Sequence, residues 1–453
     1  MLQLLQLPNE VLAIIFAGLD AEAFSALRLT CKHARSATLL AFTNRYFKTR
    51  YMMLSRLSLE NLVKIGRHPT FGPAVTRVEV CTDHFVSLPD IGFNFARHEG
   101  DMLLATREGR CLPLIRVDSI EDGHSSDAEG GQSTGEEGLG TDQDIVSSQA
   151  SEETTVDKAA YKLLWEEQEH LITSGLVQAY LTKGLMTLPN IEAVAISNRH
   201  RPWGALAHER QIGLPPTNLL DDFEDIPFVS HVLRITLTAI ATSGAALSSF
   251  ALMAGFPREA ITPDIIRPPE AYIQYYSNIS TSLRELTLNI SPTAKTGAED
   301  RWTDDLLAFI HIFSQLTHLD LIIGPTEFGP RVNRLRHLIP RLQLPGLQSF
   351  GLYSTCCSAQ DLEFFIVRRK ATLQDLHLFR IAVSGGIDHW KSLFALIRAH
   401  HPSFELYINV CTIGGLTLYF RVEKEGKERF EDDFQVGGSH EEWTRAIEAM
   451  VAR

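Results

Sequence analysis

Apolar residues recur along the second half of the chain in a frame of the form L-x-x-L-x-L. The clearest copies span residues 283–288, 316–321, 347–352 and 373–378, and their starts are 33, 31 and 26 residues apart. The end of each frame alternates apolar and polar positions, which is typical of a strand with one buried face. A period of this length predicts a solenoid of stacked units.

Helix-like stretches separate these strands, so each unit is expected to hold one strand and one helix. They span residues 304–313, 331–342, 358–370 and 388–400. Weaker frames extend the pattern toward both ends of the chain, at residues 75–80, 191–196, 232–237 and 406–410. We therefore expect parallel strands on one face and helices on the other.

Two further stretches complete the pattern. The long uncharged run at residues 235–257 contains Thr, Ser, Gly and Ala with few Leu or Ile, so it is interpreted as strand, turn and helix of a buried core and not as a membrane span. Residues 417–422 and 430–436 alternate around a charged turn and predict a terminal hairpin. Residues 441–451 predict a closing helix that covers the last unit.

The first fifty residues show helical spacing. Pro8 suits the first turn of a helix, Asp20 can cap a second one, and a third stretch covers residues 35–42. The apolar positions of the first two predicted helices are Val11, Leu12, Ile15, Phe16, Leu19, Phe24, Leu27 and Cys31. Three such short helices form a bundle that is barely stable alone and tends to bury its remaining apolar face against a partner.

The order of residues in this segment resembles a known motif. The segment contains Leu7-Pro8-x-Glu10-x-Leu12-x-x-Ile15-Phe16-x-x-Leu19 and then Leu27-x-Leu29-x-Cys31-Lys32. This order resembles the F-box, by which substrate receptors dock on the Skp adaptor of SCF-type cullin–RING ubiquitin ligases. The resemblance implies that the following residues build the F-box or face the adaptor: Leu7, Pro8, Leu12, Ile15, Leu19, Leu27, Cys31 and Lys32.

One feature departs from the F-box pattern. Many F-boxes carry an aromatic residue shortly after the Cys-basic pair, whereas this chain has His33 and Ala34. The departure indicates weaker binding to the adaptor. The competing interpretation is a plain amphipathic helical cap on the domain that follows, in which the Leu and Ile residues are merely core.

The repeated units resemble the leucine-rich repeats that follow the F-box in one large class of these receptors, although the Asn or Cys expected after the third apolar position is inconsistent here. The expected fold is mixed α/β: a small three-helix F-box followed by an irregular leucine-rich-repeat-like solenoid with parallel strands and outer helices. The expected divisions are an F-box at 1–50, first repeat units at 51–117, an acidic disordered insertion at 118–157, the repeat domain at 158–415, and a hairpin with a capping helix at 416–453.

The residues that flank the inward Leu positions of each strand point to the opposite face of the sheet. On this face exposed aromatic residues beside charges have the composition of an interaction hot spot. The candidate target-binding residues are His318, Asp320, Tyr353, Asp375, His377 and Phe379. A shared metal site among the histidines and carboxylates is not expected, because two strand spacings separate them by about 10 Å. The alternative is that a loop covers this face.

Charge is concentrated in one segment. The chain has 42 Lys and Arg against 55 Asp and Glu, a net charge of −13, and residues 118–157 hold twelve acids and no Lys or Arg. This Ser- and Gly-rich segment has too few large apolar residues to offset its ordering entropy, so it is interpreted as a solvated spacer, with a docking element as the alternative.

Other features restrict the class of protein. Six cysteines without a C-x-x-C pair fit neither a zinc module nor a disulfide framework, and the first ten residues lack the pattern of a secretory leader. We expect a cytoplasmic or nuclear protein with no cofactor, no bound metal, no nucleic-acid partner and no membrane association. A G-x-S-x-G match at residues 131–135 has no strand before it and no helix after it, so the nucleophile elbow of a hydrolase is a poor interpretation of Ser133.

These expectations converge on a non-enzymatic substrate receptor. The F-box would hold the Skp adaptor, the repeats would hold an unknown target protein, and other subunits would transfer ubiquitin. The first alternative is a repeat scaffold that acts outside the ubiquitin ligase. The second is a hydrolase that uses Ser133.

Overall fold

The computed structural model describes most of the chain outside one long segment. The described residues are 7, 9–86, 157–198, 202–213, 216, 226–254, 261–267, 273, 275–276, 279–291, 301–323, 335–384, 386–400, 404–413, 416–424, 427–436 and 440–452. Pro8, most of the predicted acidic insertion and Ser133 therefore lie outside the described residues. No helix among these residues is long and apolar enough to cross a membrane.

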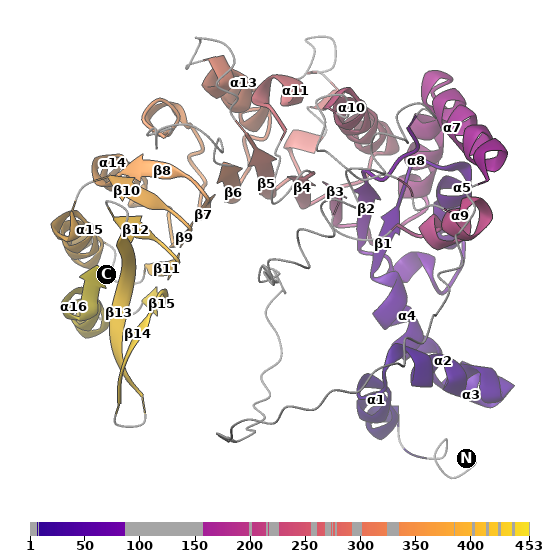
Figure 1. Cartoon of the computed structure of the whole chain (residues 1–453), viewed down its shortest axis with the longest axis horizontal. Helices are drawn as coiled ribbons and strands as arrows, with labels where there is room; N and C mark the ends of the chain where they lie inside the picture. Colours follow the sequence, from indigo (N-terminus) through magenta and orange to yellow (C-terminus); the bar gives the residue numbers. More distant parts are fainter. Residues whose placement is uncertain are drawn as a thin grey trace, which may run out of the picture.

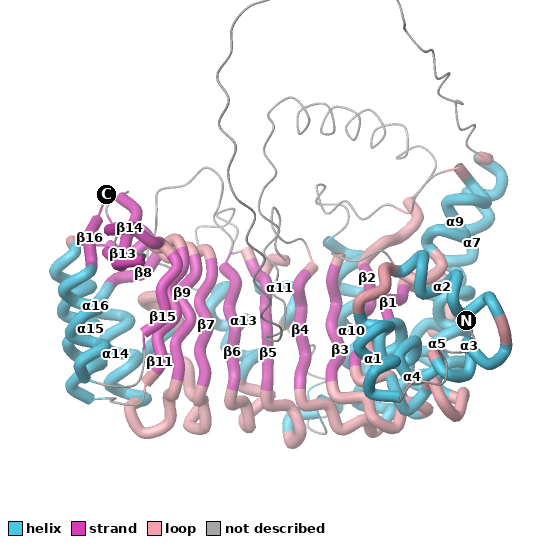
Figure 2. Tube along the Cα trace, turned by 90° about the horizontal axis from the view of Figure 1, so that it is seen from below, coloured by secondary structure: helices cyan, strands magenta, loops and turns pink. Residues whose placement is uncertain are grey.

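A ten-stranded sheet runs through the molecule, with its strands side by side in chain order (Figure 2). Its strands are β1 (Thr49–Met52), β2 (Arg77–Cys81), β3 (Ala193–Ser197), β4 (Ser249–Met253), β5 (Glu285–Ile290), β6 (His318–Ile323), β7 (Ser349–Tyr353), β9 (Asp375–Phe379), β11 (Glu405–Asn409) and β15 (Asp433–Val436). All neighbours pair in parallel except the last, where β15 is antiparallel to β11. The mixed α/β class with a mainly parallel sheet is confirmed.

Helices lie between most successive strands of this sheet, and one more helix follows its last strand. They are α5 (Arg56–Gly66), α7 (Lys158–Thr173), α8 (Leu176–Met186), α9 (Ala205–Ile212), α10 (Ile226–Ser243), α11 (Pro263–Ile266), α13 (Arg301–Ile310), α14 (Ala359–Arg369), α15 (Ile387–His400) and α16 (His440–Ala449). Figure 1 shows the strands along the inside of an arc and most of the helices along its outside.

The alternation of residues in each strand explains this layering. Leu286, Leu319, Phe350 and Leu376 are paired neighbours in one row across four strands, and all four are buried. They belong to one continuous hydrophobic core that lies between the sheet and the helices. The residues between them point to the inner face of the arc, as the alternation of the frames predicts.

Two predicted elements are wrong. Residues 232–237 were expected to form a strand but lie in α10, and the run at 235–257 is therefore helix followed by strand β4. Val229, Val232, Leu233 and Ile240 are buried at helical spacing, and a short apolar run alone does not separate this from a strand. Within the predicted helix at 331–342, the described part forms turns and a 3₁₀ helix, η3 (Ile339–Arg341), in which Pro340 has no N–H to donate.

A second, smaller sheet lies toward the C-terminus and was not predicted. Its order is β14-β13-β12-β10-β8, with β16 also on β13. The strands are β8 (Cys356–Ser358), β10 (Ala382–Ser384), β12 (Thr412–Ile413), β13 (Leu416–Lys424), β14 (Lys427–Glu431) and β16 (Met450–Ala452). β13 and β14 pair antiparallel where the alternation predicted a hairpin, whereas β15 joins the large sheet.

A repeated turn directs the chain from the large sheet into the small one. Ser354, Arg380 and Val410 directly follow β7, β9 and β11, and all three have a positive φ, between 49° and 56°. Non-glycine residues rarely adopt this left-handed conformation, which costs about 1–2 kcal/mol per residue. Three units thus use the same turn to start the strands β8, β10 and β12.

The N-terminal helices form a separate small bundle at one end of the arc (Figure 1). They are α1 (Asn9–Ala17), α2 (Ala21–Thr30), α3 (Lys32–Ala37) and α4 (Leu39–Phe47). The single third helix predicted at 35–42 is wrong, because Thr38 ends α3 and precedes α4. The Thr38 side chain is buried and its hydroxyl donates to the Ala34 carbonyl at 2.7 Å.

Candidate functional site

The helical bundle at the N-terminus has its own core. Leu12, Phe16 and Phe24 are buried together, apart from the core of the large sheet. The Phe24 ring lies 6.0 Å from the ring of Phe16 and 6.2 Å from that of Tyr46, measured between centroids. Aromatic pairs at such distances add to the free energy gained by burial. Phe24 thus joins α1 and α4 through α2.

The side chains before α2 and α3 accept hydrogen bonds from backbone N–H groups in the first turns of these helices. The Asp20 carboxylate accepts from the N–H of Ala23 at 2.7 Å and caps α2. The Cys31 sulfur accepts from the N–H of Ala34 at 3.3 Å and caps α3, and this hydrogen bond lowers the pKa of the exposed thiol. Cys31 therefore has a structural role that helical spacing did not indicate.

Two arginine side chains connect different helices of the bundle. The Arg28 guanidinium lies 3.7 Å from the centroid of the Phe42 ring, and it also donates to the Thr38 hydroxyl at 3.0 Å. Arg45 donates to the carbonyl of Leu19 at 2.6 Å and so connects α4 to the turn after α1. These contacts hold the four helices in one arrangement, which leaves a fixed outer face.

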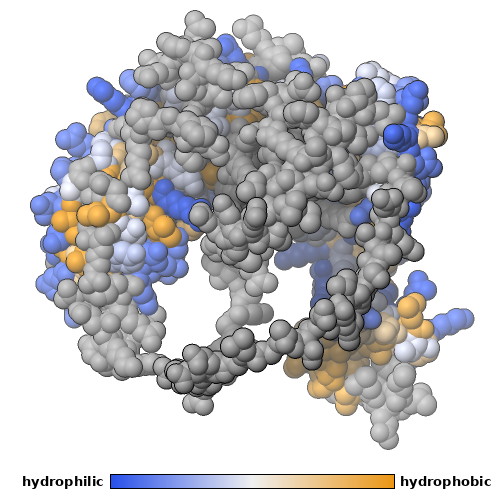
Figure 3. All heavy atoms as spheres, viewed as in Figure 1, coloured by the Kyte–Doolittle hydropathy of each residue, from blue (hydrophilic) through white to orange (hydrophobic). Residues whose placement is uncertain are grey.

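Large apolar side chains remain exposed on this outer face. Ile14, Leu29 and Leu40 are 74%, 86% and 72% exposed, and Leu7 and Val11 are also exposed. Figure 3 shows hydrophobic side chains gathered over the N-terminal helices. We call these five residues the apolar patch. Large exposed apolar patches on protein surfaces are typical of interaction sites.

The structure divides the predicted adaptor-binding residues into two groups. Leu12 is buried in the bundle, and Ile15, Leu19 and Leu27 are half-buried against the same core. Leu7, Cys31 and Lys32 are exposed. Four of the five residues of the apolar patch were not among the predicted adaptor-binding residues: Val11, Ile14, Leu29 and Leu40. The sequence pattern gave no signal for them, because these exposed residues are apolar like their buried neighbours.

On the inner face of the arc, the strand register aligns the predicted target-binding residues. His318, Ser349 and Asp375 are successive partners across β6, β7 and β9. Asp320 and His377 lie in the next row, on either side of Gly351. A Cβ at position 351 would clash with the Asp320 carboxylate, so the glycine leaves room for that carboxylate to lie over β7.

Hydrogen bonds connect these side chains. The Asp375 carboxylate accepts from the Ser349 hydroxyl and interacts with His377 Nε2 at 3.0 Å. Partial burial raises the pKa of Asp375, but the hydrogen bonds with His377 and Ser349 outweigh it, and the pKa is lowered overall. For Asp320, burial prevails over the attraction of His377 and His318, and the pKa is raised.

Aromatic rings extend this cluster. The His377 ring stacks on Tyr407 at 4.4 Å, and the Tyr407 hydroxyl donates to Glu405 at 2.6 Å. Tyr353 and Phe379 were expected to be exposed, but both are half-buried and pack on each other at 6.0 Å. Burial, together with Asp320 and Asp375, raises the pKa of Tyr353.

The inner face therefore presents a pre-arranged polar and aromatic surface. We call its central residues the inner-face cluster: His318, Asp320, Ser349, Tyr353, Asp375, His377, Phe379, Glu405 and Tyr407. Among the described residues, no group of three or more His, Cys, Asp or Glu side chains could hold a metal ion. Two carboxylates of the cluster, those of Asp375 and Glu405, accept hydrogen bonds from Ser349 and Tyr407.

Comparison with known proteins identifies the N-terminal bundle. Residues 4–40 match the model of the F-box domain. The matched segment contains α1, α2 and α3 and the first residues of α4, which together carry the apolar patch. A search of the curated proteins found no similar sequence. The chain therefore has an F-box domain at its N-terminus.

Proposed function

We propose that this protein is the substrate-recognition subunit of an SCF-type ubiquitin ligase. The observation that carries the proposal is the apolar patch, which lies on the segment that matches the F-box domain. F-box domains typically bind the Skp adaptor within cullin–RING ligases. The patch supplies the unpaired apolar surface that such an interface requires.

The composition of the patch supports a stable interface. Burying a Leu or Ile side chain contributes about 1.5–3 kcal/mol. Ile14, Leu29 and Leu40 therefore supply several kcal/mol when a partner covers them. Val11 and Leu7 extend the same surface along α1 and the residues before it. In this proposal Leu12, Ile15, Leu19 and Leu27 build the F-box from inside, while Leu7 and Lys32 contact the adaptor directly.

We further propose that the large sheet and its outer helices form an irregular leucine-rich-repeat solenoid. The parallel strands in chain order, the buried Leu row and the helices outside the arc support this assignment. The variable connections and the second sheet make the units unequal in length. The inner face of such an arc is a long surface on which a target protein can bind.

The inner-face cluster is proposed as the target-binding surface. It combines carboxylates, histidines and aromatic rings from neighbouring strands, and interface hot spots are rich in aromatic residues with polar neighbours. The protein would then act without catalytic chemistry of its own. It would raise the effective concentration of target lysines near the ubiquitin-charged enzyme.

The direct test is co-purification of the full-length protein with the Skp adaptor. We expect stoichiometric capture by the wild type. Leu29→Asp should reduce capture at least tenfold, because burying an unpaired carboxylate costs several kcal/mol. The matched control is Leu163→Asp on α7, where the leucine is 66% exposed and lies outside the F-box.

Circular dichroism should show that both variants keep the wild-type fold. Lack of capture by the wild type, or equal capture by both variants, would contradict the proposal. The alternative function, a repeat scaffold outside the ubiquitin ligase, predicts lack of capture by the wild type.

A second comparison tests the inner face. His377→Ala should retain adaptor capture but lose a target protein identified by co-purification with the wild type. His389→Ala, an exposed histidine on α15, is the control that should retain both. Loss of the target in both variants, or in neither, would place the target-binding surface elsewhere.

A further inference from the structure

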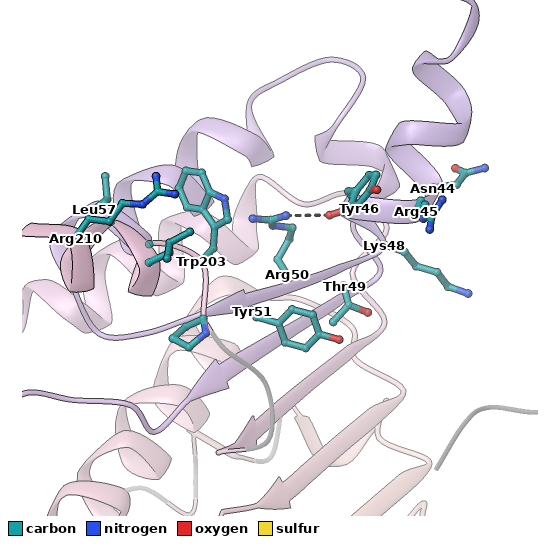
Figure 4. Close-up of a pocket in the computed structure, with 14 residues that line it drawn as sticks. Asn44, Arg45, Tyr46, Lys48, Thr49, Arg50, Tyr51, Leu57, Trp203 and Arg210 are labelled. Carbon is teal, nitrogen blue, oxygen red and sulfur yellow. Dashed lines mark hydrogen bonds between the residues drawn. The ribbon is translucent and has the colours of Figure 1, made fainter. Parts of the chain in front are cut away.

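A cavity of about 760 Å³ lies where the F-box meets the start of the large sheet. Figure 4 shows it between α4, the strand β1 and the helix α9. Its walls come from the end of α4, from β1, and from the segment around Trp203 and the first part of α9. We call it the basic pocket.

Four cationic side chains line the basic pocket: Arg45, Lys48, Arg50 and Arg210. None of the fourteen described residues that line it is Asp or Glu. Figure 4 shows Arg210 beside Trp203 at one end, Arg50 between Trp203 and Tyr46, and Lys48 at the other end. The cations are thus spread along the pocket and not gathered at one point.

Arg50 is the most buried of these cations. One of its terminal nitrogens donates to the Tyr46 carbonyl at 2.9 Å, and its guanidinium lies 5.7 Å from the ring of Trp203. Burial lowers the pKa of Arg50, and no described carboxylate forms an ion pair with it. A partly buried cation without a counter-charge is costly unless an anion approaches it.

We propose that the basic pocket binds the acidic segment of this same chain, residues 118–157. The segment holds twelve Asp and Glu and no Lys or Arg, so its charge is opposite to that of the pocket. This inference concerns a contact within the chain and does not depend on the proposed ligase function.

The described end of the segment lies beside α9, which lines the pocket. The N–H of Asp157, the last acid of the segment, donates to the carbonyl of Ile212 at 3.0 Å. Ile212 ends α9, two residues after Arg210. Glu152 and Glu153 come five and four residues before Asp157, so a coil of this length, with an end-to-end distance of roughly 12 Å, can bring them to the pocket.

The other end of the segment is anchored nearby. The N–H of Val86 donates to the hydroxyl of Tyr161, in the first turn of α7, where Asp157 caps the helix. The two described residues that flank the segment, Val86 and Asp157, therefore lie beside α7 and α9. Tethering of this kind gives an effective concentration on the order of millimolar, which favours the chain's own acids over an equally charged partner in solution.

The test is zero-length carbodiimide cross-linking of the full-length protein, followed by mass spectrometry. Carbodiimide joins a lysine amine to a carboxylate that it contacts, with loss of water. We expect Lys48 to cross-link to acids within 118–157 at least about tenfold more than Lys183, an exposed lysine on α8 outside the pocket, because the pocket raises the local concentration of these acids.

Two variants make the test specific. In the first variant, Arg50→Gln combined with Arg210→Gln should reduce the Lys48 cross-links to the level of Lys183. In the second variant, all eleven Asp and Glu residues between 118 and 153 are replaced by Asn and Gln, and the Lys48 cross-links should fall to the same level. Arg336→Gln combined with Arg284→Gln, which changes two arginines far from the pocket in the sequence, should leave the Lys48 cross-links unchanged.

Mixing protein of two isotopic compositions identifies the donor of the acids. Pairs of a single isotope support the contact within one chain, and mixed pairs would assign the pocket to a second copy and overturn the proposal. Even distribution of cross-links over Lys48 and Lys183 would overturn it too. So would cross-links from Lys48 to acids outside 118–157, or the appearance of Lys48 cross-links only after an acidic partner such as the adaptor is added.

Discussion

Single buried side chains set the response of this protein to pH. His208 on α9 is buried, its Nε2 lies 3.2 Å from the hydroxyl of Ser55, and its ring packs edge-on against Phe85 at 5.6 Å. Burial lowers the pKa of His208, and the nearby carboxylate of Glu167, which is paired with Arg56 at 2.6 Å, opposes this only in part. The fold therefore favours the neutral imidazole.

This environment predicts a loss of stability in mild acid. Below about pH 6.5, the usual pKa of histidine, the unfolded chain binds a proton that the folded chain resists. The free energy of unfolding should thus fall as the pH drops below this value. His208→Gln should make that fall shallower, as measured by urea midpoints at about pH 7.5 and about pH 5.5.

Burial also lowers the pKa values of His231 and His311. These two histidines should therefore leave part of the pH dependence of the free energy of unfolding in the His208→Gln variant. His33→Gln, at an exposed position on α3, should show the slope of the wild type. An unchanged slope in His208→Gln would show that His208 does not carry this dependence.

The roles of single residues were only partly predictable from the sequence. Periodicity placed Leu12 and Phe24 on a common helical face, and both are buried. It could not show that the Cys31 sulfur caps α3, because that depends on the extended backbone at this residue, with φ −161°. Nor could it show that Ile14 faces outward while its neighbour Ile15 packs on the core, since both are apolar.

Between helices, close approach depends on glycine. Gly184 on α8 faces Leu62 on α5, and a Cβ at position 184 would lie 2.6 Å from the Leu62 Cδ2. At the neighbouring contact, a Cβ at Gly66 would clash with the hydroxyl of Thr187. A side chain at either glycine would therefore force a shift of the neighbouring side chain or of the helices.

Gly184→Val should consequently destabilise the protein by about 1–3 kcal/mol, because overpacking forces the helices apart or the side chains out of their rotamers. Differential scanning calorimetry should show the lower melting temperature. Gly386→Val is the control, since no atom lies within 4 Å of a Cβ built at position 386. Equal melting temperatures for the two variants would show that α5 and α8 can separate without cost.

At the scale of elements, the frames located strands β5, β6, β7 and β9, whose starts recur at steps of 33, 31 and 26 residues. They failed at α10, whose residues are apolar on nearly every side. The second sheet was not predicted, for a different reason. Its strands β8, β10 and β12 are two or three residues long, and the left-handed turns before them occur at Ser354, Arg380 and Val410, residues that do not signal such a turn.

Across the whole molecule, the F-box and the sheet have separate hydrophobic cores. The small core contains Leu12, Phe16 and Phe24, whereas the large one runs from Met52 to Met450. A stack of rings connects α4 with the residue before η2 (Gly72–Ala74), in which Phe47 lies 4.1 Å from Phe71 and Phe42 lies 6.4 Å from the same ring. Because this connection is narrow, the F-box and the large sheet should lose structure independently of each other.

This separation could not be predicted from the sequence, where the predicted F-box boundary at residue 50 falls inside β1, a strand of the large sheet. Apolar periodicity shows which positions are buried but not which of two cores they join. That assignment follows from the pairing of β1 with β2, a contact between residues 28 positions apart in the chain.

Independent cores predict local effects of core substitutions. Phe24→Ala removes the ring that joins α1, α2 and α4, at a cost of about 3–5 kcal/mol. Hydrogen exchange of backbone amides should therefore accelerate throughout residues 9–47 and stay unchanged in strands β5 to β9.

The reciprocal control is Phe309→Ala in α13, where the ring is buried against Phe313 at 5.3 Å. It should accelerate exchange in those strands and leave the F-box protected. Faster exchange across the whole chain in either variant would show that the rings of Phe47 and Phe71 transmit unfolding, and that the F-box and the large sheet form one cooperative unit.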